Sequence, residues 1–182
     1  LCVLSLLPLL VTSRIPQLPA SLAANLGSTS ILITVGVALD LVDKTIDGVR
    51  VVVCGAGTVG IGCVRLLLAL GVPADNLFVY DAAGLLHVDR KDLHDYQRPF
   101  QRSKGPRTLG EGIIGADVFL GASAGHVLST DMVRAMGRFP VVLALATPHP
   151  EIEYEAAKGS RRDVLVATAL DQHPNAVVDL LS

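Results

Sequence analysis

A glycine-rich turn, Gly55–Gly60, is the feature of this sequence that most directly indicates chemistry. It reads Gly-Ala-Gly-Thr-Val-Gly and matches the pattern G-x-G-x-x-G. In such a turn the first glycine permits a tight bend, the second lets the backbone approach a pyrophosphate, and the third lets a helix pack on a strand. Free amides at the start of the helix would face the phosphates. The turn predicts a dinucleotide site with contacts from Gly55, Gly57, Thr58, Val59 and Gly60.

An acidic residue follows at a suitable distance. Asp81 lies 26 positions after Gly55, at the end of a predicted strand, and a ribose-binding acid is expected after roughly 20 residues. A carboxylate there would accept hydrogen bonds from the ribose hydroxyls of NAD and repel the 2′-phosphate of NADP. Ala82 and Ala83, rather than Lys or Arg, come directly after it. The sequence therefore favours NAD over NADP. The alternative to a dinucleotide site is a glycine turn that binds no ligand, in which Asp81 only caps a loop.

Two later loops also carry small residues where predicted strands end. One contains Ala122 and Ser123, and the other contains Thr147 before a proline. Ligands of open α/β sheets lie across the carboxyl ends of the strands. We therefore expect both loops to touch the nicotinamide half of the dinucleotide, with ordinary tight turns as the alternative.

The elements that must position these residues alternate between strand and helix. Val49–Cys54 is an apolar run broken only by Arg50, which is typical of a strand buried on both faces of a parallel sheet. Five parallel strands with intervening helices predict an α/β fold with a doubly wound, Rossmann-like sheet. The remaining strands are expected at 77–80, 117–120, 140–145 and 164–167, and the helices at 61–70, 130–136 and 151–158.

The chain divides into an apolar lead-in, residues 1–45, and a dinucleotide-binding domain, residues 46–182. A helix is expected over 21–42, leading into the sheet. Residues 1–11 could pass for the core of a signal peptide and 15–39 are long enough to cross a bilayer, but the first run lacks a basic leading segment and the second contains prolines and polar residues. We expect buried structure there rather than a membrane as partner. The absent initiator Met suggests a piece of a longer chain.

Composition excludes several classes of protein. The 182 residues carry 15 Lys plus Arg against 17 Asp plus Glu, so there is no net attraction for nucleic acid. Hydrophobic residues make up 51% and charged residues 18%, which excludes a disordered chain and allows a large aliphatic core. The three cysteines form no C-x-x-C pair, so we expect a cytoplasmic protein without disulfides or a thiolate metal site.

Other polar residues give weaker signals. The five histidines are scattered without i, i+4 spacing, so we expect surface or capping roles rather than metal ligands. Asp89, Asp92 and Asp95 would share one helical face in the segment 89–107, but Arg and Lys surround them. A solvated, mixed-charge loop or short helix is favoured over a cation site. No residue pattern indicates a hydrolase.

The ordered series of motifs resembles the NAD-binding domain of malic enzymes, especially the bacterial type. Residues 47–63 are similar to that family's first strand, glycine turn and helix, and 81–86 with 90–93 to its Asp-x-x-Gly turn and Arg-x-x-Leu segment. Residues 115–124 and 144–152 continue the likeness in order. The resemblance covers about residues 30–180. It implies oxidative decarboxylation of malate to pyruvate and CO2, with NAD or NADP as hydride acceptor, Mg or Mn as Lewis acid, a Tyr and a Lys from a preceding domain, and association into a homo-oligomer.

The chain also departs from the family pattern in the half that would hold malate and metal. The segment 24–29 has no carboxylate where the family has a metal-binding Asp, and Thr147 stands where the family has a substrate-binding Asn. Val178-Asp179 replaces a family Asn-Asn pair, whereas Asn175 is retained and is a candidate substrate contact. We therefore expect an intact nucleotide half, no metal ligands and no identifiable catalytic residue. Two functions stay open: the cofactor half of a malic enzyme, or an inactive nucleotide-binding remnant or sensor.

Overall fold

The computed structural model describes residues 36, 39 and 43–169. Of the helix expected over 21–42, it describes only Gly36 and Leu39, both helical. The remainder of that helix, the apolar run 1–11 and the segment 24–29 lie outside the described residues. Within the described part, no helix is both long enough and apolar enough to span a membrane.

The centre of the fold is one six-stranded sheet in the order β3-β2-β1-β4-β5-β6. Five strands are parallel, as predicted. Each of them pairs with its parallel neighbour from the first residue onward, so the starts of these strands are level across the sheet. Their bounds are β1 Val51–Cys54, β2 Leu77–Asp81, β4 Val118–Gly121, β5 Val141–Ala144 and β6 Leu165–Thr168.

The sixth strand, β3 (Gly84–Leu85), was not predicted and runs antiparallel to β2. Two residues are too few to show a hydrophobic period. The strand exists because Ala82 and Ala83 form a tight turn that folds the chain back from Asp81 to Gly84.

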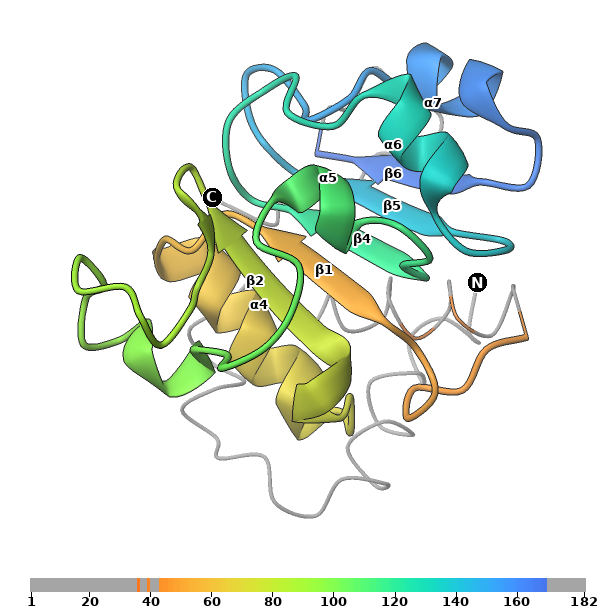
Figure 1. Cartoon of the computed structure of the whole chain (residues 1–182). Helices are drawn as coiled ribbons and strands as arrows, with labels where there is room; N and C mark the ends of the chain where they lie inside the picture. The colour runs from red at the N-terminus through yellow and green to blue at the C-terminus, as the bar shows by residue number, and fades with distance from the viewer. Residues whose placement is uncertain (1–35, 37–38, 40–42, 170–182) are drawn as a thin grey trace, which may run out of the picture.

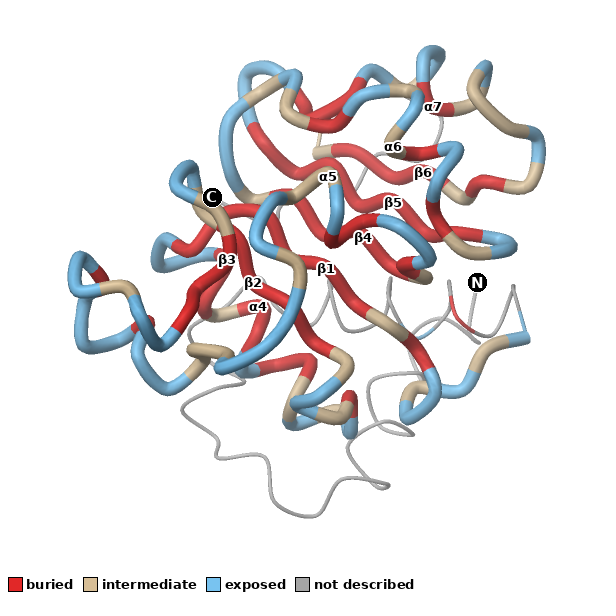
Figure 2. The backbone as a smooth tube through the Cα atoms, viewed as in Figure 1, coloured by how far each residue is buried: buried red, intermediate tan, exposed pale blue. Residues whose placement is uncertain are grey.

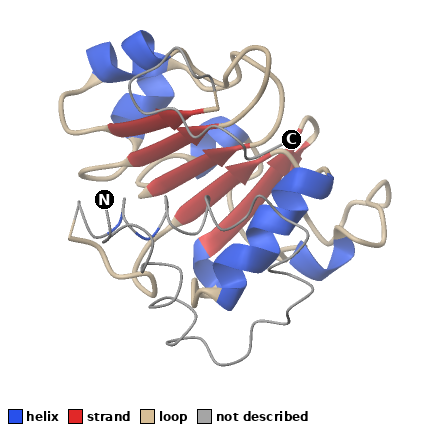
Figure 3. Ribbon diagram, turned by 180° about the vertical axis from the view of Figure 1, so that it is seen from behind, coloured by secondary structure: helices blue, strands red, loops and turns tan. Residues whose placement is uncertain are grey.

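Helices cover both faces of the sheet, as a doubly wound fold requires (Figure 1). Helix α4 (Thr58–Ala69) lies against one face, which is turned toward the viewer in Figure 3. The other face carries α5 (Leu109–Gly112), α6 (Thr130–Ala135) and α7 (Tyr154–Ser160). Short 3-10 turns lie at Ala74–Asn76 and Arg98–Phe100.

Three of these helices differ from the sequence prediction. Helix α7 begins at Tyr154 rather than at residue 151. Helix α4 begins at Thr58 rather than Ile61, so the second half of the glycine motif is already helical. Helix α5 was missed, although its signal is present: Thr108 and Glu111 form a reciprocal capping box, a recognised start signal for helices.

The strands separate two apolar cores, and their central segments are buried throughout (Figure 2). Along β1, Val51 and Val53 pack in the core beneath α4, while Val52 and Cys54 pack in the core beneath α5, α6 and α7. This alternation follows from the two-residue period of a strand. It explains why the sequence of β1 is apolar at every position.

The order of the strands creates a switch point between β1 and β4. From β1 the chain crosses to β2 on one side, and later returns to β4 on the other side. The loops that leave β1 and β4 therefore diverge at the carboxyl edge of the sheet and leave a crevice, which is the usual ligand position in this architecture.

Candidate functional site

The glycine turn is held by two contacts that only glycine permits. Gly55 has φ of +113°, and a Cβ there would lie 2.2 Å from the Ala122 carbonyl oxygen. A Cβ on Gly60 would lie 1.7 Å from the Gly55 carbonyl oxygen. Two of the three glycines are therefore needed by the protein itself, to close the turn on the β4 loop and on α4.

Gly57 is different, because a Cβ at this position would meet nothing within 4 Å. It is the N-cap of α4, and no side chain caps the helix there or supplies a carboxylate in its first turn. The backbone amides at a helix start lack intrahelical acceptors and carry partial positive charge. Gly57 thus opens an uncapped, electropositive helix end to a ligand.

Asp81 is the last residue of β2, and its carboxylate makes two kinds of contact. Its Oδ1 accepts a hydrogen bond from the Ala83 amide at 2.9 Å. Arg90 makes a two-pronged ion pair with it, Nη1 to Oδ1 at 2.7 Å and Nη2 to Oδ2 at 2.8 Å. Asp81 therefore caps the turn, as the alternative interpretation held, and also presents a carboxylate beside the glycine turn.

Arg90 is a site residue that the sequence did not single out. No basic residue follows Asp81 directly in the sequence, but the fold brings Arg90, nine positions downstream, back into contact with Asp81. It also bonds Asp92, and these hydrogen bonds, first to Asp92 and then to Asp81, raise the pKa of the guanidinium above its usual value. A permanent positive charge therefore accompanies Asp81, the predicted ribose-binding acid.

A cleft of about 470 Å³ opens between these elements. Its walls come from the ends of β1 and β2, the start of α5 and the loop after β4. The lining residues are Cys54, Gly55, Asp81, Ala82, Ala83, Gly84, Arg107, Thr108, Leu109, Ser123, Ala124 and Val127. Asp81 is the carboxylate in this lining, and the small residues leave room for a flat ring.

The loop after β4 is joined to the glycine turn. The Ala122 amide donates to the Cys54 carbonyl at 2.8 Å, and the Ser123 Oγ lies 3.5 Å from the Cys54 Sγ. Burial raises the pKa of the Cys54 thiol, so this group stays neutral beside the cleft. Ser123 itself is exposed toward the cleft mouth.

A buried carboxylate, Glu151, organises the same edge of the sheet and was missed in the sequence. It is fully buried; its Oε1 accepts from the Ser123 amide at 2.9 Å and its Oε2 from the Ala146 amide at 3.1 Å. A Cβ on Gly121 would lie 2.2 Å from the carboxyl carbon. Glu151 therefore ties the loop after β4 to the loop after β5, and it requires a glycine at the end of β4.

Thr147 lies on the loop after β5 and is exposed, one residue beyond the amide that binds Glu151. It is thus on the carboxyl edge but not in the lining of the cleft. Asn175, the other candidate substrate contact, lies outside the described residues.

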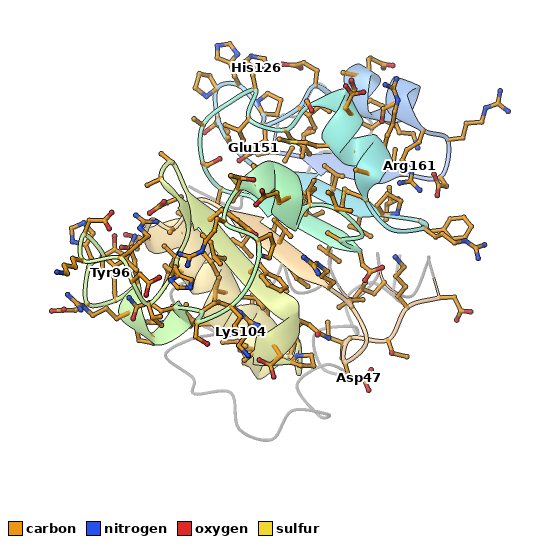
Figure 4. All side chains as sticks on the ribbon, viewed as in Figure 1. Asp47, Tyr96, Lys104, His126, Glu151 and Arg161 are labelled. Atoms are coloured by element: carbon orange, nitrogen blue, oxygen red, sulfur yellow. The ribbon has the colours of Figure 1, made fainter. Side chains whose placement is uncertain are left out.

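Two features of the histidines could not be anticipated from their spacing in the sequence. His87 is 3% exposed and therefore not a surface residue, but it fits the capping alternative, since its Nδ1 accepts from the Asp89 amide at 3.1 Å and its Nε2 lies 3.0 Å from the Ser103 carbonyl oxygen. His126 and His149 come together, with ring centroids 5.7 Å apart, and Figure 4 shows His126 on the outside of the molecule. Among the described residues, no three of His, Cys, Asp and Glu gather as a metal site would need.

The charged segment 89–107 is a mixed-charge surface loop, as predicted, but without the helical face expected for its aspartates. Asp89 pairs with Arg107 and Asp95 with Arg98. One helical turn occurs there, at Arg98–Phe100. The segment is also less solvated than expected, because Leu93 and Gln97 are buried.

Comparison with known proteins identifies one family. The family described as "Malic enzyme, NAD binding domain" matches residues 27–170. An NADP-dependent malic enzyme of Halomonas elongata is 39% identical over 144 residues, covering 79% of this chain and 34% of the relative. An NAD-dependent malic enzyme of Rhizobium meliloti is 36% identical over 156 residues, covering 84% of this chain and 20% of the relative.

Solved structures support the same family assignment. The NAD-dependent malic enzyme of Thermotoga maritima superposes with a TM-score of 0.75 at 35% identity, over 82% of this chain and 41% of that one. The malic enzyme of Entamoeba histolytica gives a TM-score of 0.75 at 29% identity, over 82% of this chain and 33% of that one. The chain thus spans a fifth to two fifths of the length of these relatives.

Proposed function

Since this chain belongs to the malic enzyme family and carries that family's NAD-binding domain, we propose that it binds a dinucleotide at the switch point between β1 and β4. The proposed contacts are Gly55, Gly57, Thr58, Val59, Gly60, Asp81, Ala122 and Ser123, with Thr147 at the rim. The proposed domain comprises residues 46–182, with 1–45 as a lead-in.

One observation carries the proposal: the three glycines of the turn divide into two that the fold needs and one that it does not. Gly55 and Gly60 are in backbone contact, whereas Gly57 faces open space. A glycine without a packing reason at the start of an uncapped helix is what close approach of a pyrophosphate requires. The bound dinucleotide would accept or supply hydride, and the chain's own part is to hold its phosphates and ribose.

We propose NAD as the preferred cofactor. Each oxygen of an ionised carboxylate has about two acceptor sites. In Asp81 both sites of Oδ1 are taken, by Ala83 and Arg90, but Oδ2 receives one bond, from Arg90. One acceptor site therefore remains for a ribose hydroxyl. A 2′-phosphate would meet this carboxylate as well as the guanidinium, and the named relatives include both NAD- and NADP-dependent enzymes.

Calorimetric titration of the chain with NAD and with NADP tests the proposal, together with the variant Gly57→Ala. We expect the variant to fold normally and to lose most of its affinity for NAD, because the added methyl group occupies the phosphate position. Gly159→Ala is the matched control, since Gly159 also has nothing within 4 Å and lies in α7, away from the turn. If the unaltered chain gives neither heat nor thermal stabilisation with both nucleotides, the proposal is wrong.

We further propose that the parent reaction is the oxidative decarboxylation of malate to pyruvate, carried out by an oligomeric enzyme to which this chain contributes the cofactor half. The metal-binding Asp of the family pattern has no counterpart in the segment 24–29, so this segment does not supply that ligand to Mg or Mn. The 182-residue chain mixed with malate, NAD and Mn should bind nucleotide without turnover. Sustained NADH production that Gly57→Val abolishes would contradict this expectation. If the full-length parent protein bound the nucleotide but catalysed no reaction, a sensor role would be favoured instead.

A further inference from the structure

A glutamine from a distant segment reaches into the glycine turn. Gln97 is 7% exposed, and its Nε2 donates to the Ala56 carbonyl oxygen at 2.8 Å, across 41 positions of sequence. Its Oε1 accepts from the His94 amide at 2.9 Å. Both ends of the side chain are therefore fixed, whereas its neighbour Tyr96 is exposed (Figure 4).

The hydrogen bond from Gln97 holds one particular peptide group of the glycine turn. The Gly55 amide donates to the Tyr80 carbonyl at 2.8 Å, and the Gly57 carbonyl accepts from the Ile61 amide at 2.9 Å. The peptide between these two anchors joins Ala56 to Gly57. Its carbonyl is held by the side chain of Gln97.

In a trans peptide the C=O and the N–H point in opposite directions and the group is rigid. Holding the Ala56 carbonyl toward the buried glutamine therefore directs the Gly57 N–H away from Gln97. The surroundings of Gly57 are open, since a Cβ there would meet no atom within 4 Å. From this geometry we propose that Gln97 is a positioning residue, which sets the orientation of the Ala56–Gly57 peptide so that the Gly57 amide faces the phosphates of the dinucleotide. The inference rests on the proposed dinucleotide function.

The same segment carries Arg90, which pairs with Asp81 at the ribose end of the cleft. Between the two, Leu93 is 4% exposed and packs in the core beneath α4. One stretch of chain, from Arg90 to Gln97, is thus anchored at its middle and touches both the predicted ribose acid and the phosphate turn. Loss of the Gln97 bond should therefore weaken phosphate binding without disturbing the Asp81–Arg90 pair.

The test compares NAD affinity in the unaltered chain and in Gln97→Met, which keeps the length of the side chain but removes the donor to Ala56 and also the acceptor of the His94 amide. The matched control is Gln101→Met, because Gln101 lies on the same segment and its Nε2 donates to the His87 carbonyl at 3.5 Å rather than to the turn. One intramolecular hydrogen bond contributes a factor of roughly 2 to 12. We expect about a tenfold rise in the Kd for NAD in Gln97→Met and less than a twofold change in the control, with adenosine inhibiting the binding of NAD to all three proteins with equal potency.

A second variant separates positioning from mere packing. In Gln97→Glu the new carboxylate would face the Ala56 carbonyl as an acceptor, but once protonated it has an O–H that donates as the amide did. Because position 97 is buried and faces a carbonyl oxygen, the pKa of the new carboxyl should lie above the usual value for Glu. The affinity for NAD should therefore be low at pH 8 and recover toward that of the unaltered chain as the pH falls to about 5.5. The unaltered chain must be titrated over the same range as the reference.

The outcomes are distinguishable. If the unaltered chain does not bind NAD, the proposed function is wrong and the inference falls with it. If it binds and both Gln97 variants bind equally well at every pH, the positioning role is wrong while the proposed function stands. If Gln97→Met loses NAD and adenosine affinity alike, together with a lower melting temperature, Gln97 acts through general packing and the positioning role is again wrong.

Discussion

Replacing Asp81 by alanine should change which nucleotide the chain prefers. In the structure this carboxylate accepts three hydrogen bonds, two from Arg90 and one from Ala83, and Oδ2 retains one acceptor site. A hydrogen bond involving a charged group contributes about 1.5–3 kcal/mol. Because a single bond to the ribose is available, we expect the lower value, about 1.5 kcal/mol, or roughly a tenfold loss of NAD affinity.

For NADP the same substitution removes a repulsion. It also leaves Arg90 with Asp92 as its remaining carboxylate partner, so part of the guanidinium becomes available to a 2′-phosphate, which such a group binds well. We expect the Kd for NADP to stay constant or to fall. The ratio of the Kd for NADP to the Kd for NAD should therefore drop by about tenfold or more.

Isothermal titration with both nucleotides at one ionic strength measures this ratio. Asp92→Ala is the matched control, because it also removes a partner of Arg90 but has a 61% exposed side chain and does not line the cleft. Its ratio should change by less than threefold. Equal weakening of NAD and NADP in Asp81→Ala, at an unchanged melting temperature, would refute the assigned role and leave Asp81 as a turn cap.

Three further outcomes follow from the geometry. Gly60→Ala should destabilise the fold by several kcal/mol or prevent folding, since its Cβ would lie 1.7 Å from a backbone oxygen; a melting temperature within 2 °C of the original would contradict the packing described. Glu151→Ala should lower the free energy of unfolding by about 3 kcal/mol in urea titrations, because buried amides of Ser123 and Ala146 lose their acceptor, and an unchanged transition would show that these amides find another partner. Burial raises the pKa of Cys63 to about 11 and that of Tyr80 to about 12, so the folded state holds these protons more tightly than the unfolded state. Stability should consequently fall as the pH rises from about 9 toward 12, and Tyr80→Phe should reduce the part of that loss that lies above pH 10.

The sequence by itself determined the parallel sheet and the glycine turn. Both features depend on short, contiguous stretches of sequence. Strand β1 is apolar at every position because it is buried on both faces, and the residues of the G-x-G-x-x-G motif follow one another directly. The ordered motifs also identified the family, which the comparisons confirm.

Other features depend on contacts between segments that the sequence keeps far apart, and only the tertiary structure decided them. Arg90 reaches Asp81 because β3 turns the chain back, Gln97 reaches Ala56 across 41 positions, and Glu151 ties together loops that are 28 and five positions away. Arg90 and Glu151 lie in segments that resemble the family, but the sequence does not show which groups any of the three side chains contacts. Their roles arise from burial and from the backbone groups that burial leaves in need of a partner, and these exist only once the sheet has formed.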